Sequence, residues 1–226
     1  TLFPYTTLFR SGSMFRPLRT RRFLRAGLVF GLAALAAVAA GRGADAAPAT
    51  PAAPPSIAVW LAPYAGSFNT NNNDFNVATH LVLKFPDLVR AATRPGNSTV
   101  FLPSDYAFRA WVKGATGVTV VNEAALFDAV VTLSGPNLGH LVRYHIVKNA
   151  RLGYTQLVAL NHKPVVTSDG STFTVRTAPW AGHRIPFVFL TDKTTTTPDP
   201  KITNGNITVS NGIIHVIDRV MLPMVS

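Results

Sequence analysis

The sequence of 226 residues contains no cysteine. This absence excludes disulfide bonds, thiol nucleophiles and cysteine-ligated metal centres. The chain must therefore hold its fold together by core packing and hydrogen bonds. The sequence also lacks a second long apolar run after the one near its N-terminus, and it has no repeat with a period of about 20 to 50 residues. These absences predict one domain and no membrane-spanning helix in the main part of the chain.

Acidic residues are scarce, with 10 Asp and Glu against 21 Lys and Arg, for a net charge of +11. The first 46 residues hold seven of the basic residues and one of the acidic ones, which leaves 14 and 9, or +5, for the remainder. Most of the excess therefore belongs to the N-terminal segment, and it does not indicate nucleic-acid binding. The residual positive charge still favours acidic partners such as anionic polysaccharide.

The first 13 residues, "TLFPYTTLFRSGS", show neither a helical nor an alternating period of apolar residues. They resemble the translation of a sequencing adapter fused in frame to a reading frame that starts at Met14. The alternative is a genuine N-terminal extension. Segments of this kind are set aside when a fold is considered.

Residues 14–46 have the three parts of a secretory signal peptide. Arginines precede a 15-residue apolar run, Ala26 to Ala40, and the small residues Ala44-Asp45-Ala46 offer a cleavage site. The run is too short to span a membrane, which takes about 20 residues. The stretch "TRRFLR" resembles a twin-arginine export signal but lacks the usual spacer, so ordinary secretion fits equally well. We expect an exported protein, of bacterial type, that is secreted, periplasmic or held at the cell surface.

Residues 47–55, "APATPAAPP", are a Pro/Ala linker, which is typically extended and semi-rigid. The domain should occupy residues 56–226. Apolar residues between Phe75 and Ala92 follow a helical spacing that Pro86 interrupts, which predicts two short helices. The polar run "TDKTTTTPDPK" predicts an exposed, mobile loop.

The block "TVFLPSDYAFRAW" predicts a strand followed by a helix. Pro103 should end the strand, and Ser104 should cap the helix, with Asp105 favourably placed in its first turn. Phe108 and Trp111 lie three residues apart and should enter the core together.

The C-terminal third is rich in strand-forming residues, and its strongest signal is "NITVSNGIIHVID". Asn211-Gly212 is a pair favoured in type I′ hairpin turns, because both residues tolerate positive φ. The following run is apolar on both faces, which predicts a central strand covered on both sides.

Three blocks together resemble the fasciclin-like domain family. "TVFLPSDYAF" resembles its first signature, "YHI" its central Tyr-His motif and "SNGIIHVIDRVMLP" its second signature, in the same order and at similar spacing. The resemblance covers about Ser56 to Pro223. It implies an α+β fold, a wedge-shaped β-sandwich of about seven strands with several packed helices.

The resemblance also implies a role in adhesion through a cell-surface or matrix protein, or through polysaccharide, without catalysis or a cofactor. We expect a monomer. The family places an adhesion epitope at Tyr144 and His145, and the neighbouring cations Arg143 and Lys148, with Arg151, would suit an acidic glycan. A competing interpretation is that His145 faces inward and hydrogen-bonds the turn at Pro103 to Asp105. Tyr144 would then be the better contact for a ligand. The cations, in turn, could simply form a solvated face.

Other chemistry finds little support in the sequence. His215 and Asp218 fall on opposite faces of a strand and cannot form a catalytic pair, so we expect satisfied structural groups. No histidine pair has the spacing of a zinc protease, and no Gly-x-Ser-x-Gly motif marks a hydrolase. We therefore predict neither a metal site nor catalytic residues. Two other functions stay open: a secreted enzyme acting on envelope polymers, which needs a cleft with convergent carboxylates or a Ser-His pair, and a small-molecule carrier, which needs an apolar cavity.

Overall fold

The computed structural model describes residues 52–223 except 180, 183 and 196. The described residues fall in one compact unit, Thr50–Ser226. The predicted adapter-like segment, the predicted signal peptide and most of the predicted Pro/Ala linker lie outside the described residues. Within the described ranges, no helix is long and apolar enough to cross a membrane.

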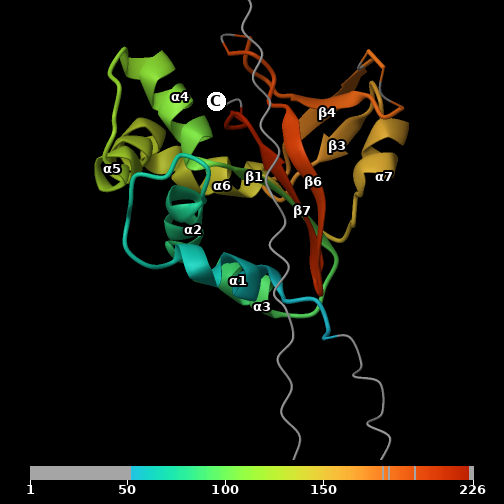
Figure 1. The fold of residues 1–226 in the computed structure, drawn as a ribbon, viewed down its shortest axis with the longest axis horizontal. Coiled ribbons are helices and arrows are strands. Elements are labelled where there is room, and N and C mark those ends of the chain that lie inside the picture. The colour runs from blue at the N-terminus through green and yellow to red at the C-terminus, as the bar shows by residue number, and fades with distance from the viewer. Residues whose placement is uncertain (1–51, 180, 183, 196, 224–226) are drawn as a thin grey trace, which may run out of the picture. The chain divides into compact units, whose positions relative to one another are not determined.

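Helices dominate the first half of the unit and strands the second (Figure 1). The α-helices are α1 (Ile57–Leu61), α2 (Asn76–Leu83), α3 (Pro86–Thr93), α4 (Asp105–Thr116), α5 (Glu123–Ser134), α6 (Leu138–Tyr144) and α7 (Tyr154–Ala159). The strands are β1 (Ser98–Pro103), β2 (Ile146–Val147), β3 (Pro164–Val166), β4 (Thr172–Ala178), β5 (Phe187–Thr191), β6 (Ile202–Val209) and β7 (Gly212–Ile217).

The strands form two sheets. One has four strands in the order β2-β1-β7-β6, in which β1 and β7 run parallel and the other neighbours antiparallel. The other is antiparallel, in the order β3-β4-β5. In the part of the chain that the structure describes, one isolated bridge, Phe189 to Lys201, links the sheets. The predicted α+β class with about seven strands is confirmed, although the sandwich is not closed.

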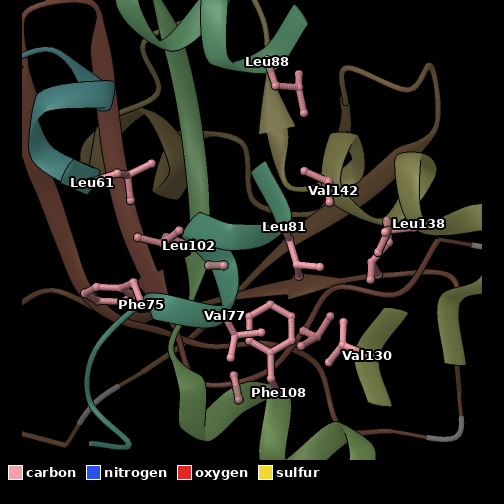
Figure 2. Close-up of a cluster of buried hydrophobic side chains, with 14 of the residues drawn as sticks. Leu61, Phe75, Val77, Leu81, Leu88, Leu102, Phe108, Val130, Leu138 and Val142 are labelled. Carbon is pink, nitrogen blue, oxygen red and sulfur yellow. The ribbon is translucent and has the colours of Figure 1, made fainter. Parts of the chain in front are cut away.

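A first core lies between the helices and the four-stranded sheet. Helices α2 and α4 supply Leu81 and Phe108, and strand β1 supplies Leu102 from the sheet side (Figure 2). Phe108 and Trp111 both contribute to this core, as their spacing predicts. Figure 1 shows α2, α4 and α5 on one side of β6 and β7, with β3, β4 and α7 on the other.

A second core fills the space between the two sheets. Phe101 of β1 meets Phe173 of β4 edge to face, with ring centroids 5.3 Å apart. Strand β7 serves both cores, because Ile214 packs on the helix side and Ile217 on the inter-sheet side. The prediction of a central strand covered on both faces is confirmed.

Two proline predictions are also confirmed. Helix α3 begins at Pro86, which separates it from α2, and strand β1 ends at Pro103. Proline lacks the N–H that a continuing helix or strand would need, and its ring restricts the residue before it.

The predicted exposed loop after β5 is partly wrong. Asp192 is buried and accepts hydrogen bonds from the backbone N–H groups of Thr194 (3.0 Å) and Leu222 (2.8 Å). Asp199 accepts from the Thr191 hydroxyl at 2.9 Å. Asp192 therefore holds the loop against the C-terminal segment, and Asp199 ties it to β5. Composition alone does not reveal such contacts.

Candidate functional site

The Tyr-His segment ends helix α6 and leads into β2. His145 is 6% exposed and points inward, as predicted. Its Nδ1 donates to the carbonyl of Leu141 (2.8 Å), and its Nε2 accepts from the backbone N–H of Met221 (3.0 Å). The predicted partner, the turn at Pro103 to Asp105, is therefore wrong: the ring ties α6 to the segment after β7. Burial lowers the pKa of His145 to about 4, so the ring is neutral at physiological pH.

Tyr144 is fully buried in the inter-sheet core. Its hydroxyl donates to the carbonyl of Thr172 at 3.0 Å, which links α6 to the three-stranded sheet. A side chain with no exposed surface cannot touch a ligand directly. The interpretation of Tyr144 as the better ligand contact therefore does not fit this geometry.

The cations around the Tyr-His segment are not all available to contact an acidic ligand. Arg143 pairs with Asp87 at 2.9 Å and lies over the ring of Phe85, and this hydrogen bond lowers the pKa of Asp87. Arg151 donates to the backbone carbonyls of Val209 and Gly212. Lys148 is exposed and has no recorded ion pair within the described ranges.

The first signature builds the start of α4. Ser104 occupies the N-cap position, but its side chain makes no capping hydrogen bond. Asp105 is fully buried, and its Oδ1 accepts the backbone N–H of Val77 at 3.1 Å. Asp105 therefore caps the first turn of the neighbouring helix α2, in addition to lying in the first turn of its own.

Asp105 belongs to a buried carboxylate cluster that sequence reasoning missed. Oxygen atoms of Asp74, Asp105 and Glu123 lie within 4.8 Å of one another, and the three residues are 7%, 0% and 0% exposed. Three carboxylates at this spacing are a donor set that hard cations such as Ca²⁺ prefer. The three residues are 18 to 49 positions apart in the sequence, so no local motif indicates the cluster.

Groups of the chain already offset much of the cluster's charge. Arg109 lies 3.6 Å from Glu123, and Asn69 donates its backbone N–H to Glu123 (2.7 Å) and its side-chain amide to Asp74 (2.8 Å). Burial, followed by a hydrogen bond to Asp74, raises the pKa of Asp105 to about 8. A protonated Asp105 relieves the like-charge repulsion within the cluster.

The second signature ties the β6–β7 hairpin to the helices. Asn211 is buried, and its amide donates to the carbonyls of Ala92 (2.8 Å) and Arg94 (3.0 Å) while accepting from the N–H of Ile57 (2.9 Å). One side chain thereby fixes the turn against α1 and the end of α3.

The predicted type I′ turn at Asn211-Gly212 is wrong. The turn comprises Ser210 and Asn211, and Gly212 already pairs with Val209 as the first residue of β7. Neither Asn211 nor Gly212 has a positive φ. Glycine is required at 212 for space, since a Cβ there would lie 2.3 Å from the carbonyl oxygen of Ser98 in β1.

His215 and Asp218 have structural partners, as expected. His215 is fully buried, its Nε2 donating to the carbonyl of Leu152 (2.8 Å) and its Nδ1 facing the N–H of Asn206 (3.4 Å). Burial lowers the pKa of His215. Asp218 accepts the backbone N–H of Lys201 at 2.8 Å, which fastens the end of β7 to the start of β6.

The described unit is thus an α+β domain with two open sheets, and its signature residues His145, His215 and Asp105 are buried. The Fasciclin domain family model matches residues 73–223, so the chain belongs to the fasciclin domain family. Members of this family are adhesion-type modules, typically extracellular or at the cell surface.

Among solved structures, the chain is similar to a FAS1 domain pair from the insect cell adhesion molecule Fasciclin I. The identity is 16% and the TM-score 0.51, over 74% of this chain and 51% of that one. The chain thus spans about half the length of that relative, and the likeness shows a shared fold. Among curated proteins, none matches the sequence.

Proposed function

We propose that the chain is a non-catalytic binding module that acts in adhesion, at the cell surface or outside the cell, through protein or polysaccharide ligands. The observation that carries this proposal is membership of the fasciclin family across residues 73–223. The site geometry supports it, because the signature residues serve the fold and not a reacting centre.

The burial of the titratable groups argues against the alternative of an enzyme that acts on envelope polymers. A general acid or base must come within hydrogen-bond reach of its substrate. The carboxylate cluster converges as such an enzyme would need, but its members are at most 7% exposed, and His145 and His215 are 6% and 0% exposed. A polymer chain cannot reach any of these groups in this conformation.

The interior also gives little support to a small-molecule carrier. The apolar cavity beside His145, lined among others by Leu81, Phe108 and Val142, has a volume of about 50 Å³. Ligand pockets typically measure about 300 to 1,000 Å³. The cavity is therefore far too small for a carried molecule.

The domain organisation forms part of the proposal. Residues 14–46 would direct export, residues 47–55 would hold the domain away from its N-terminal attachment, and residues 56–226 would bind. The compact unit that begins at Thr50 supports the last boundary.

Within this module, Tyr144 and His145 act as internal ties that shape the surface above them. Lys148 is exposed beside them and stays a proposed ligand contact. Arg143 contributes less, because Asp87 already neutralises its charge at 2.9 Å.

The test begins with fractionation of cells and culture medium, followed by binding of the purified exported protein to arrays of glycans and matrix proteins. Retention on defined ligands at the surface or in the medium is expected. A cytoplasmic protein that binds no ligand would overturn the proposal.

A further inference from the structure

A groove lies where the two sheets separate, between α7, β5 and β6. Its volume is about 640 Å³, within the range of ligand sites. Tyr154 and Val158 of α7, Phe187 of β5 and Ile202 of β6 line it with apolar surface. None of the signature residues discussed above lines this groove.

The sheets open here because β6 leaves the regular ladder. The bridge between Phe189 and Lys201 joins β5 to the start of β6, and beyond it β6 shows register shifts on both sides of Asn204. Asn206 has a φ of 62°, and its side chain accepts the backbone N–H of Tyr154 at 2.7 Å. The distorted part of β6 therefore holds the first turn of α7 in place.

The ring of Tyr154 is fixed from two sides. Its hydroxyl donates to the carbonyl of Pro186 at 2.9 Å, and a Cβ at Gly205 would lie 3.0 Å from the ring. The absence of a side chain at Gly205 thus leaves room for the ring against β6. A positioned aromatic surface needs little ordering when a ligand arrives.

The lining of the groove is basic. Arg184 and Lys201 contribute two cations, and no acidic residue lines it. The Lys201 ammonium lies 5.3 Å from the centroid of the Phe187 ring, and neither cation has a recorded ion pair within the described part of the chain. The nearby carboxylate of Asp218 accepts the backbone N–H of Lys201. Within the described residues, no ion pair therefore neutralises the charge of either cation.

Hydroxyl and amide groups surround this basic and aromatic surface. Thr155, Thr203 and Asn206 are exposed along the rim. An apolar floor with aromatic rings, a hydrogen-bonding rim and two cations matches the C–H faces, hydroxyls and carboxylates of an acidic sugar chain. An extended peptide would need a regular strand edge for backbone pairing, which the bulged β6 does not provide.

We propose that the groove between α7, β5 and β6 binds an anionic oligosaccharide of the uronic-acid type, with Arg184 and Lys201 on its carboxylates and Tyr154 and Phe187 against its rings. This proposal rests on the proposed function, since it names the ligand class and the place where the module binds it.

The experiment titrates oligogalacturonate into the purified exported protein by calorimetry. The fully methyl-esterified oligosaccharide and poly-glutamate serve as comparison ligands. The variants are Arg184→Gln with Lys201→Gln, and Lys148→Gln at the proposed contact beside the Tyr-His segment. The matched control is Lys113→Gln, which removes an exposed cation in the last turn of α4, away from both places. Loss of both groove cations should weaken binding of oligogalacturonate by about tenfold or more, because charge-assisted hydrogen bonds to its carboxylates would be lost. The control should change it by less than about twofold.

The methyl ester should bind at least about tenfold more weakly than the acid, since it keeps the rings and loses the charge. Tighter binding of poly-glutamate than of oligogalacturonate would assign the groove to acidic peptides and overturn the proposal. Binding of oligogalacturonate that depends on Lys148 and not on the groove cations would also overturn it, while leaving the binding-module function standing. A protein that is retained by array ligands but does not bind oligogalacturonate refutes this inference alone, whereas failure to bind anything refutes the proposed function.

Discussion

At the scale of single residues, His145 shows how a family motif serves the fold. Its two ring nitrogens join Leu141 of α6 to Met221 beyond β7, and the hydrogen bond with Met221 spans 76 positions in the sequence. A hydrogen bond over this separation fixes the position of the C-terminal segment without a disulfide. His145 therefore links α6 to the segment after β7, and a substitution of His145 should affect ligand binding only through the loss of this link.

Replacement of His145 by alanine should lower the free energy of unfolding by about 1–3 kcal/mol, because a buried N–H and a buried carbonyl lose their partner. Urea denaturation followed by circular dichroism measures this change. The matched control is His140→Ala, whose side chain is 62% exposed and should matter by less than about 0.5 kcal/mol. Equal changes in the free energy of unfolding for the two substitutions would show that the hydrogen bonds of His145 do not stabilise the fold.

Asp105 should make the folded protein less stable as the pH rises. A carboxyl group whose pKa is lowered by folding has the opposite effect. Burial raises its pKa from 3.8 to about 8, so the folded protein keeps a proton that the unfolded chain releases. The stabilising contribution of this proton is full below pH 4 and is lost as the pH rises from about 4 to 8. The carboxyl groups of Asp74 and Glu123 face Asp105, and Arg109 pairs with Glu123.

Asp105→Asn should therefore reduce the loss of stability between pH 5 and pH 8 by about 1–3 kcal/mol, since asparagine keeps an acceptor for Val77 and cannot ionise. Urea midpoints at the two pH values, for the wild type and the variant, measure the difference. Asp87→Asn, in the exposed pair with Arg143, is the control and should leave the slope unchanged. An unaltered slope in Asp105→Asn would mean that Asp105 is ionised throughout.

At the scale of elements, the strongest helices and strands could be predicted from the sequence and the short ones could not. Pro86 and Pro103 mark ends because proline acts locally. Helix α7 and strand β3 have six and three residues, too few to show a period, and packing against β4 stabilises both. The sequence pattern predicts the hairpin turn one residue too late. The Asn-Gly pair reflects a buried amide and a close strand contact, and not turn geometry.

Gly212 tests that correction. Gly212→Asn should lower the free energy of unfolding by about 1–3 kcal/mol, because its Cβ would overlap the Ser98 carbonyl of β1. Under the type I′ interpretation, asparagine would be tolerated at positive φ. Gly114→Ala is the control: the site in α4 is open, so the change should stabilise by about 0.5–1 kcal/mol. A stable Gly212→Asn protein in thermal melts would restore the original interpretation.

At the scale of the whole molecule, the order of the motifs was enough to predict the family and the α+β class, because each of the three signatures is a short continuous stretch of sequence. The candidate site was less predictable. The carboxylate cluster joins Asp74, Asp105 and Glu123 from three different segments, and the groove brings α7 beside β5 and β6. Such juxtapositions arise from long-range packing, which no single stretch of sequence encodes.

Export makes a prediction for the chain as a whole. The mature protein should begin near Ala47, after the signal peptide and before the Pro/Ala linker. Mass spectrometry of protein recovered from the medium or envelope identifies its N-terminus. Native material that begins at Thr1 would contradict both the signal-peptide and the adapter interpretations.

The central claim is that this module binds its ligand without transforming it. The most direct measurement holds the purified exported protein with an array-selected glycan or protein ligand for a day and then analyses both by mass spectrometry. We expect the ligand to be retained on immobilised protein and recovered with its mass unchanged. Shortened or chemically altered ligand, absent from a parallel sample of heat-denatured protein, would contradict the claim.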